Sequence, residues 1–409
     1  MHCPEAQRIF GKGKETSIVR APTGYTFADI LGYYYFDAVM SAFYCEYANQ
    51  YIIKLKQENV LELAPFKPKQ TNYLRPSSPL HVVWLLTKRC NLKCVYCYAN
   101  ATYVGDFEAQ RLLNRELTSS ERKKVAKELI DLGVKKVTFS GGEPTLIPDL
   151  PSLIRMLIKH DIIIHLPANG YAINEKLAKS LKDAGLENIQ VKLDAANPET
   201  QDTLSSIRGS FYRMVNAIKL LKKLKFRVCV VSVVTSLNIK EIPEVVRICA
   251  ELGVDEYRPA TYLPGCWALQ GRGGAWLYPS KDDMRWLSIE LSKLKKELSG
   301  IMEIKSYETL KKKEPEKMPW CSTFIISCCI LPDARVSVCE MVADYDERFI
   351  IGNLKLQSLY EIWNSEEALK WLKRHEIYSY SEQCRECSFF NAVSYTHLRA
   401  HETEADIVC

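Results

Sequence analysis

Short apolar runs alternate with longer amphipathic segments between residues 80 and 260, and this alternation limits the possible folds most strongly. Such a pattern is typical of βα repeats that build a parallel sheet. The expected strands are His81–Leu86, Lys136–Phe139, Ile162–Leu166, Ile189–Leu193, Phe226–Val234 and Glu256–Ala260; the expected helices are Ser119–Leu132, Leu150–His160, Asn174–Ala184, Phe211–Leu224 and Ile242–Leu252. We therefore predict an α/β protein.

Three cysteines, Cys90, Cys94 and Cys97, follow the first expected strand in the run TKRCNLKCVYCY. Thiolates at this spacing on a loop can wrap one face of a metal cluster. A cubane iron–sulfur cluster normally takes four cysteines, so three would leave one iron open to a substrate or cofactor. A structural zinc site is the alternative, but it needs a fourth ligand that the run does not contain.

A second motif closes the next expected strand, where Ser140 is followed by Gly141, Gly142 and Glu143. Two glycines let the backbone approach a ligand closely. A carboxylate with neighbouring backbone oxygens can accept hydrogen bonds from an ammonium group. The two motifs, in this order and at this spacing, resemble the signature of the radical S-adenosylmethionine (radical SAM) superfamily.

This resemblance implies an open, TIM-like (βα)6 barrel with a 4Fe–4S cluster held by Cys90, Cys94 and Cys97. It implies that the reduced cluster passes one electron to SAM, and that the resulting 5′-deoxyadenosyl radical abstracts hydrogen from a substrate. The residues that it places at SAM are Tyr96 beside the adenine, Ser140, Gly141, Gly142 and Glu143 at the methionine end, and Asn169 after the third strand.

Three further polar residues could line the SAM or substrate pocket. Lys192 and Asp194 flank Leu193 on the fourth strand, and Asn238 follows the fifth. Lys192 departs from the serine that many relatives have there, so no ribose contact is assigned to it. The alternative for each is a turn or barrel-rim residue without a ligand.

Cysteines reappear in the C-terminal part of the chain. The segment around Cys321, Cys339, Cys384 and Cys387 resembles a SPASM domain, which implies auxiliary iron–sulfur clusters. Ala334 stands where that family usually has glycine, and a turn with positive φ would tolerate alanine poorly. Cys328 or Cys329 could supply a missing ligand, and a zinc half-site is the alternative for the last pair.

The division expected from these features is 1–79 as a small N-terminal α+β domain and linker, 80–300 as the barrel, and 301–392 as an incomplete SPASM-like extension. Residues 393–403, VSYTHLRAHET, resemble translated sequencing-adapter sequence. We therefore exclude Val393–Cys409 from the fold, and we expect the natural protein to continue with further cysteine ligands.

Composition limits the partners. A net charge of +6 over 409 residues is too small to argue for nucleic acid, and no apolar run approaches a membrane span. Without a secretion signal, fifteen cysteines suggest metal or redox chemistry in the cytoplasm. The resemblance implies an enzyme that modifies a peptide or protein side chain and receives electrons from a flavodoxin or ferredoxin. The alternatives are a maturase of another enzyme, a cofactor- or tetrapyrrole-building enzyme, and a non-catalytic iron–sulfur or zinc protein.

Overall fold

The computed structural model describes residues 76–262, 274–305, 323–340, 343 and 347–372. Residues 1–75 of the expected N-terminal domain lie outside the described residues. So do Cys321, Cys384 and Cys387, and the expected adapter-derived tail Val393–Cys409.

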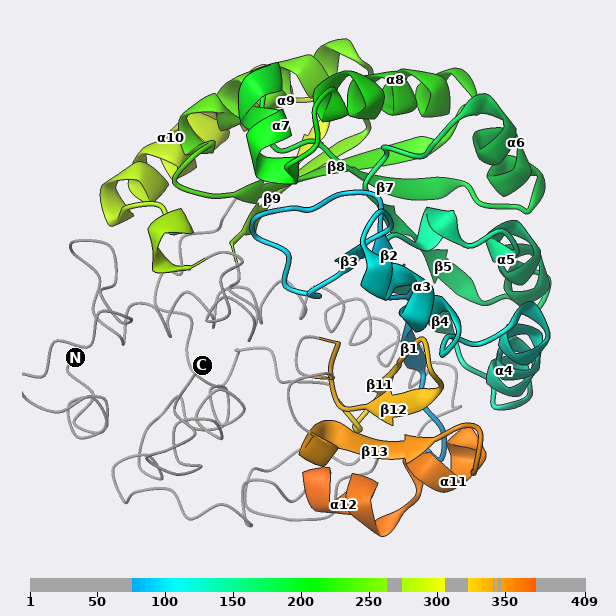
Figure 1. Ribbon diagram of the computed structural model, residues 1–409. Helices are drawn as coiled ribbons and strands as arrows, with labels where there is room; N and C mark the ends of the chain where they lie inside the picture. Colours follow the sequence, from blue (N-terminus) through cyan, green and yellow to red (C-terminus); the bar gives the residue numbers. More distant parts are fainter. Residues whose placement is uncertain (1–75, 263–273, 306–322, 341–342, 344–346, 373–409) are drawn as a thin grey trace, which may run out of the picture.

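An open barrel of parallel strands forms the centre of the described structure (Figure 1). Strands β1, β4 and β5 pair in one sheet, and β6, β7, β8 and β9 pair in another. Only Leu166 separates β5 from β6, so a single bent run joins the two sheets. The strands are β1 (His81–Thr87), β4 (Lys136–Gly141), β5 (Ile163–His165), β6 (Pro167–Ala168), β7 (Asn188–Lys192), β8 (Arg227–Val234) and β9 (Glu256–Thr261). The α/β class and the six expected strand positions are confirmed.

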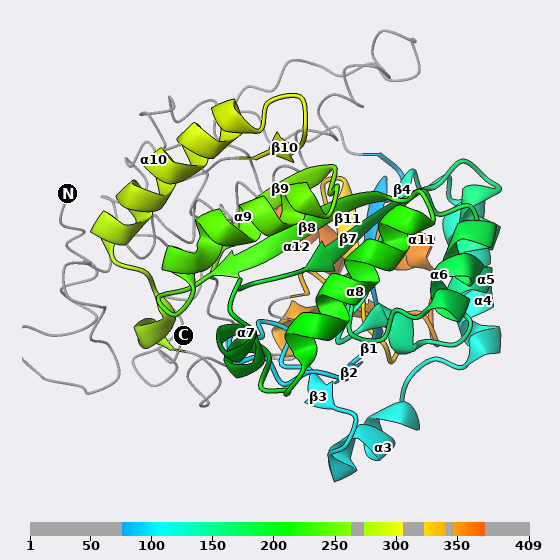
Figure 2. The same cartoon turned by 90° about the horizontal axis from the view of Figure 1, so that it is seen from above.

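Helices cover the outer face of the barrel in a continuous arc (Figures 1 and 2). They are α4 (Ser119–Asp131), α5 (Leu150–Ile158), α6 (Glu175–Asp183), α8 (Ser210–Lys223), α9 (Ile242–Glu251) and α10 (Lys281–Glu297). Thr118 caps α4 in a capping box with Glu121, and Gly133 after it has φ +71°. The apolar faces of these helices pack against alternate residues of the strands, such as Val82 and Trp84, which are both fully buried.

Between β1 and β8, two short helices were not expected. These are α3 (Phe107–Leu113) and α7 (Pro198–Ser205), and the structure also has single 3-10 turns at Pro144–Leu146, Ile239–Glu241, Ala275–Leu277 and Glu347–Phe349. Asn197 caps α7 by accepting a hydrogen bond from the Glu199 amide, and Pro198 occupies the first turn. The signal was therefore present in the sequence, but the segment is too short for a clear helical period.

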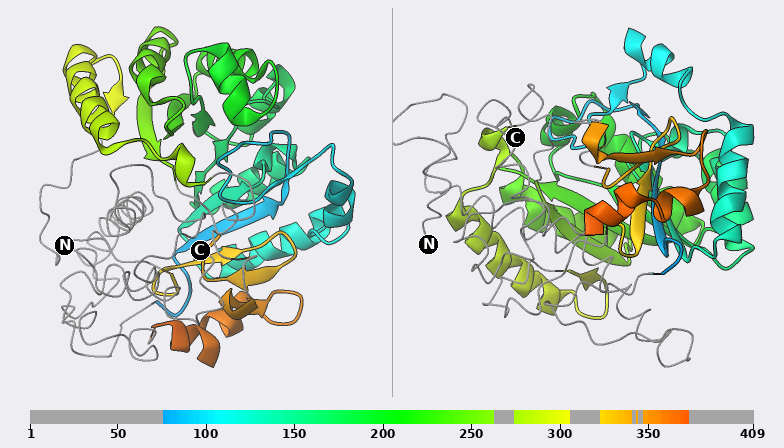
Figure 3. Two further views of the ribbon diagram at one scale, coloured as in Figure 1. Left: turned by 60° about the vertical axis from the view of Figure 1, so that its left-hand side comes forward. Right: turned by 90° about the horizontal axis from the view of Figure 1, so that it is seen from below.

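The C-terminal part of the chain extends the barrel sheet. Strand β11 (Ser327–Ile330) pairs in parallel with β1, and β12 (Arg335–Ser337) and β13 (Ile350–Asn353) continue the sheet in antiparallel order. Helices α11 (Leu359–Trp363) and α12 (Glu366–Leu372) lie beside β13, as Figure 3 shows. On the opposite edge, β10 (Glu303–Ile304) pairs in parallel with β9. Neither edge strand was expected.

Trp363 packs within this extension and also ties it to the segment before the barrel. The ring of Trp363 stacks on Phe324 at a centroid distance of 5.4 Å, and its Nε1 donates to the carbonyl of Pro76 at 2.9 Å. Pro76 lies just ahead of β1, so α11 is tied to the segment that leads into the barrel.

The turn between β11 and β12 has the positive φ that was expected at Ala334. Ala334 has φ +79° and is completely buried. A left-handed alanine costs about 1–2 kcal/mol, which a glycine would avoid. The turn is formed all the same, because the Ala334 amide donates to the Leu331 carbonyl at 3.0 Å and its own carbonyl accepts from Leu354 at 2.9 Å.

None of the helices in the described parts of the chain combines the length and the apolar character that crossing a bilayer requires.

Candidate active site

Cys90, Cys94 and Cys97 lie on one loop, and hydrogen bonds join the two ends of this loop. Short strands β2 (Arg89–Cys90) and β3 (Thr102–Tyr103) pair in parallel across the base of the loop. The Thr102 amide donates to the Lys88 carbonyl at 2.9 Å, and the Val104 amide donates to the Cys90 carbonyl at 2.8 Å. Closing the loop in this way fixes the positions of the cysteines relative to the end of β1.

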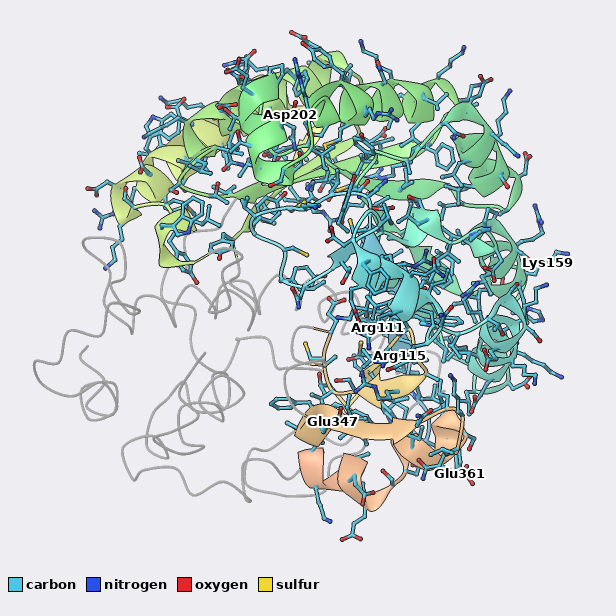
Figure 4. The ribbon with its side chains drawn as sticks, viewed as in Figure 1. Arg111, Arg115, Lys159, Asp202, Glu347 and Glu361 are labelled. Carbon is cyan, nitrogen blue, oxygen red and sulfur yellow. The ribbon has the colours of Figure 1, made fainter. Side chains whose placement is uncertain are left out.

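Helix α7 supports the middle of the loop. The backbone carbonyls of Ser205 and Leu204 accept hydrogen bonds from the amides of Lys93 and Val95, each at 3.0 Å. Asp202 of α7, labelled in Figure 4, in turn accepts from the Ser210 amide at 2.8 Å and so joins α7 to α8. The helix missed from the sequence is therefore part of the scaffold that holds the cysteines.

Glu116 fixes the entry to the loop. Its carboxylate accepts hydrogen bonds from the Thr87 hydroxyl at 2.5 Å and the Lys88 amide at 3.0 Å, and it pairs with the Arg89 guanidinium at 3.0 Å. The Glu116 side chain is 4% exposed, so these bonds lie out of water. Nothing in the local sequence pattern identified this residue.

We expect Glu116→Ala to destabilise the fold by about 3 kcal/mol, because it leaves a largely buried guanidinium without its carboxylate. Loss of cluster iron should accompany it, since Arg89 directly precedes Cys90. Glu108→Ala is the matched control: its pair with Arg111 is about half exposed, and such pairs contribute about 0.2–1 kcal/mol. Urea denaturation and iron content measure both effects. Equal losses in the two variants would contradict the role given to Glu116.

The three thiols differ in their exposure. Cys90 is buried, whereas Cys94 and Cys97 are half-buried, and all three are free. Burial raises the pKa of the Cys90 thiol, and the nearby Glu143 carboxylate and Cys94 raise it further. Cys90, Cys94 and Glu143 are therefore close enough to interact electrostatically. Iron would have to displace the thiol protons on binding.

Neutral hydrogen-bond donors face the sulfur of Cys90. The Leu92 amide lies 3.4 Å from this Sγ, and Nδ2 of Asn169 lies 3.7 Å from it. The same Nδ2 donates to Oδ1 of Asn91 at 2.7 Å. The side chain of Asn169, expected at SAM, therefore ties the end of β6 to the cysteine loop.

A charged donor faces the sulfur of Cys94. Nζ of Lys192 lies 3.0 Å from Cys94 Sγ, 2.8 Å from the Tyr96 hydroxyl and 3.3 Å from Oδ2 of Asp194. The Tyr96 hydroxyl also donates to the Asp194 carboxylate. These four residues form what we call the Lys192 cluster. The sequence marked Lys192 only as a departure from serine, because contact with Cys94 across 98 positions leaves no local signal.

Electrostatics hold the Lys192 cluster in its charged form. Desolvation alone would lower the pKa of Lys192, but Cys94, Tyr96 and Asp194 outweigh it and raise that pKa well above its ordinary value. Burial raises the pKa of Tyr96, and the adjacent Asp194 raises it further. The geometry pairs the Lys192 ammonium with the Asp194 carboxylate at 3.3 Å.

The ring of Tyr96 packs in a small apolar cluster of its own. Its neighbours there are Ala195, Leu204, Tyr262, Leu277 and Tyr278, all buried. These residues come from the ends of β7, α7 and β9 and from the segment before α10. An apolar wall beside the cysteine loop is suited to an aromatic base.

Glu143 is buried at the end of β4, with 1% of its surface exposed. One carboxylate oxygen accepts from the amide and hydroxyl of Thr145, and the other accepts from the Asn169 amide at 2.8 Å. Burial raises the pKa of this carboxyl despite these bonds. Glu143 thus joins the ends of β4 and β6 while its charge remains close to Cys90.

The two glycines allow a close approach within the protein. A Cβ at Gly141 would lie 2.3 Å from the Thr87 carbonyl oxygen, and one at Gly142 would lie 2.2 Å from that of Arg89. Both positions therefore require glycine for contact with the backbone that leads into the cysteine loop. The Gly142 amide donates to Thr87 at 2.7 Å, and the Glu143 amide donates to Arg89 at 2.9 Å.

Ser140 connects the site to the C-terminal extension. The buried carboxyl of Glu340 forms hydrogen bonds with Ser140 and Tyr98. These bonds lower the pKa of Glu340, but burial raises it by more. Glu340 follows Cys339, and both lie within electrostatic reach of Cys329. Cys328 points to the opposite side of β11, into the main core. Cys339, the described auxiliary ligand that we expect, thus interacts electrostatically with Cys329.

Asp194 and Asn238 have all their described bonds within the protein. Asp194 accepts from the Val233 amide at 2.8 Å, and Nδ2 of Asn238 donates to the carbonyls of Asp194 and Val233 at 2.6 and 2.8 Å. Oδ1 of Asn238 accepts from Thr235. Asn238 is a buried turn residue, which was the alternative to a pocket role.

The donor set of the cysteine loop fits a cubane cluster. The thiols of Cys90, Cys94 and Cys97 are all free. The cysteines of a cube bind different irons, so three of them leave one iron without a protein ligand. Donors already face the sulfurs of Cys90 and Cys94, as they do in sites that tune metal ligands.

Comparison with known protein families gives two matches. The model of the radical SAM superfamily matches residues 84–249, and that of SPASM, an iron–sulfur cluster-binding domain, matches residues 321–388. The first range contains the three cysteines of the loop and the glycine motif, and the second contains Cys339.

Two curated relatives are similar over most of the chain. An AdoMet-dependent heme synthase of Methanosarcina barkeri is 24% identical over 355 residues, which cover 81% of this chain and 94% of the relative. A PqqA peptide cyclase of Bradyrhizobium diazoefficiens is 27% identical over 326 residues, which cover 76% and 79%.

The fold is similar to that of SuiB from Streptococcus suis. The crystal structure of SuiB superposes with a TM-score of 0.66 at 16% identity, covering 88% of this chain and 87% of that one. The structure of SuiB bound to its precursor peptide SuiA gives 0.65 at 16% identity, with coverages of 91% and 89%.

Proposed function

This chain belongs to the radical SAM superfamily and carries a SPASM domain, and we propose that it modifies a side chain of a peptide or protein substrate. Its cofactors are a 4Fe–4S cluster, SAM and auxiliary iron–sulfur cluster or clusters of the SPASM domain. When bound, the first cluster supplies the electron that cleaves SAM to a hydrogen-abstracting radical. The observation that carries the substrate class is the similarity to a PqqA peptide cyclase over three quarters of the chain.

In this proposal Cys90, Cys94 and Cys97 hold the cluster, leaving one iron for SAM. Glu143 places its carboxylate beside this loop, and the wall around Tyr96 excludes water from one side of the cofactor. The remaining positions assigned to SAM are Ser140, Gly141, Gly142 and Asn169. The described contacts of Gly142 and Asn169 join β4 and β6 to the segment that carries the cysteines.

The auxiliary site belongs to the C-terminal extension. We propose Cys321, Cys339, Cys384 and Cys387 as its ligands, of which Cys339 is described. We keep the division at residues 79, 300 and 392 as part of the same proposal. An acidic one-electron carrier of the flavodoxin or ferredoxin kind is the proposed donor, since reduction of the cluster requires one.

A tetrapyrrole substrate is the second candidate. The observation that favours it is the heme synthase of Methanosarcina barkeri, of which the alignment covers 94%. Peptide and tetrapyrrole differ in charge and shape, so a direct comparison of the two separates the candidates.

The test uses the full chain, with iron and sulfide restored under anaerobic conditions and dithionite as reductant. Release of 5′-deoxyadenosine from SAM is measured by mass spectrometry, without a substrate, with a precursor peptide of the SuiA or PqqA kind, and with an iron porphyrin. We expect release in all cases, and a mass change in the peptide only. No release at all would overturn the enzymatic proposal, and a changed porphyrin would favour the second candidate.

A further inference from the structure

The Lys192 cluster contains a cation that the proposed reaction has not yet used. Nζ of Lys192 lies 3.0 Å from Cys94 Sγ, and the side chain is 15% exposed. An ammonium with so little access to water interacts with its neighbours more strongly than an exposed one. Its nearest sulfur is a proposed cluster ligand, so its charge acts directly on the cluster.

The position of this ammonium is fixed by Asp194, which is completely buried. One carboxylate oxygen of Asp194 pairs with Lys192, and the other accepts from the Val233 amide. The Asp194 amide donates to Oε1 of Gln201 at 2.7 Å, and its carbonyl accepts from Asn238. Since every polar group of Asp194 is bonded, the ammonium is held in place before any cofactor binds.

The hydrogen-bond donors that face the sulfur of Cys90 differ in charge from the donor that faces the sulfur of Cys94. Cys90 receives a backbone amide and a side-chain amide, both neutral, whereas Cys94 receives a full positive charge. The reduction potential of an iron–sulfur cluster depends on its net charge and on hydrogen bonds to its sulfurs. A fixed positive charge beside one cysteine ligand favours the reduced cluster, which carries one more electron than the oxidised cluster.

We propose that Lys192 is a tuning residue, whose ammonium donates to the Cys94 sulfur and raises the reduction potential of the cluster at Cys90, Cys94 and Cys97. The inference rests on the proposed cluster ligands. The step is the uptake of one electron from a one-electron reductant, and Lys192 keeps its proton throughout. Contacts with Asp194 and Tyr96 hold the Lys192 ammonium beside the Cys94 sulfur. This role would explain why a lysine stands where many relatives have a serine.

The test is an EPR-monitored redox titration of the reconstituted full chain. Addition of SAM identifies the signal of the three-cysteine cluster, because only that cluster has an iron open to SAM. Four variants separate charge from hydrogen bonding. Lys192→Met removes both, Lys192→Gln keeps an N–H donor, and Lys192→Arg keeps both. Lys222→Met removes the same charge on α8, where Nζ pairs with Asp255 at 2.5 Å.

We expect a more negative midpoint potential in Lys192→Met, a smaller shift in Lys192→Gln, and the wild-type potential in Lys192→Arg and Lys222→Met. An unmoved potential in Lys192→Met, or an equal shift in Lys222→Met, would overturn the inference. If Lys192→Met does not retain iron, identical potentials in the Gln and Arg variants overturn it instead. A wild-type protein without a SAM-sensitive signal would refute the proposed function itself, which keeps the two failures distinct.

Discussion

Cys94→Ala is expected to abolish SAM cleavage, with 5′-deoxyadenosine falling to the level of protein without iron. Two thiolates cannot hold three irons of a cube, and the cluster would be lost or incomplete. The substitution also leaves the Lys192 ammonium without its sulfur partner. Mass spectrometry of the nucleoside and the visible absorption of the reconstituted protein measure the two losses.

Cys249→Ala provides the matched control for this variant. Cys249 is completely buried in α9. Removing its sulfur should cost about 1 kcal/mol through lost packing and leave the cluster intact. If Cys94→Ala retained the iron content and activity of Cys249→Ala, the assignment of Cys94 as a ligand would be wrong.

Gly142→Ala should destabilise the barrel strongly for a change of a single methyl group. The added Cβ would lie 2.2 Å from the carbonyl oxygen and 2.6 Å from the carbonyl carbon of Arg89, and backbone cannot move aside as a side chain can. Overpacking typically costs 1–3 kcal/mol and occasionally more, so we expect a loss of about 3 kcal/mol. Because Arg89 leads directly into Cys90, cluster iron should fall as well.

Gly133→Ala separates this clash from the general effect of replacing a glycine. Gly133 closes α4 at φ +71°, and a Cβ there would meet nothing within 4 Å. The expected cost is therefore about 1 kcal/mol from the left-handed backbone alone. Urea denaturation and iron content of the two variants give the comparison, and equal stability would show that Gly142 does not need to be a glycine.

The barrel could be predicted from sequence because its signals are local. Apolar period, capping residues and terminal glycines lie within one element, and the expected ends of α4 and α8 fall within one residue of the observed ones. Pairing of β11 with β1 joins residues about 245 positions apart, and no periodicity encodes such a contact. The three strands of the extension, β11, β12 and β13, were therefore not predicted.

The candidate site was predictable by residue type but not by interaction. Cysteines and glycines marked the loop and the end of β4, whereas the reason for Gly142 came only from the distance to Arg89. Glu116 and Lys192 act through contacts with distant segments. Lysine and glutamate are common on protein surfaces, so their types alone gave no indication of a buried role.

The parallel register between β11 and β1 has a consequence for how large a substrate the enzyme can accept. His81 to Trp84 pair one by one with Ser327 to Ile330, so the cysteine loop after β1 and Cys339 after β12 are mounted on one continuous sheet. A tethered module could swing outward to admit a bulkier molecule, but a shared sheet keeps the cysteine loop and Cys339 at a set separation. We expect changes in substrate range to arise by remodelling of the rim loops, with this separation left unaltered.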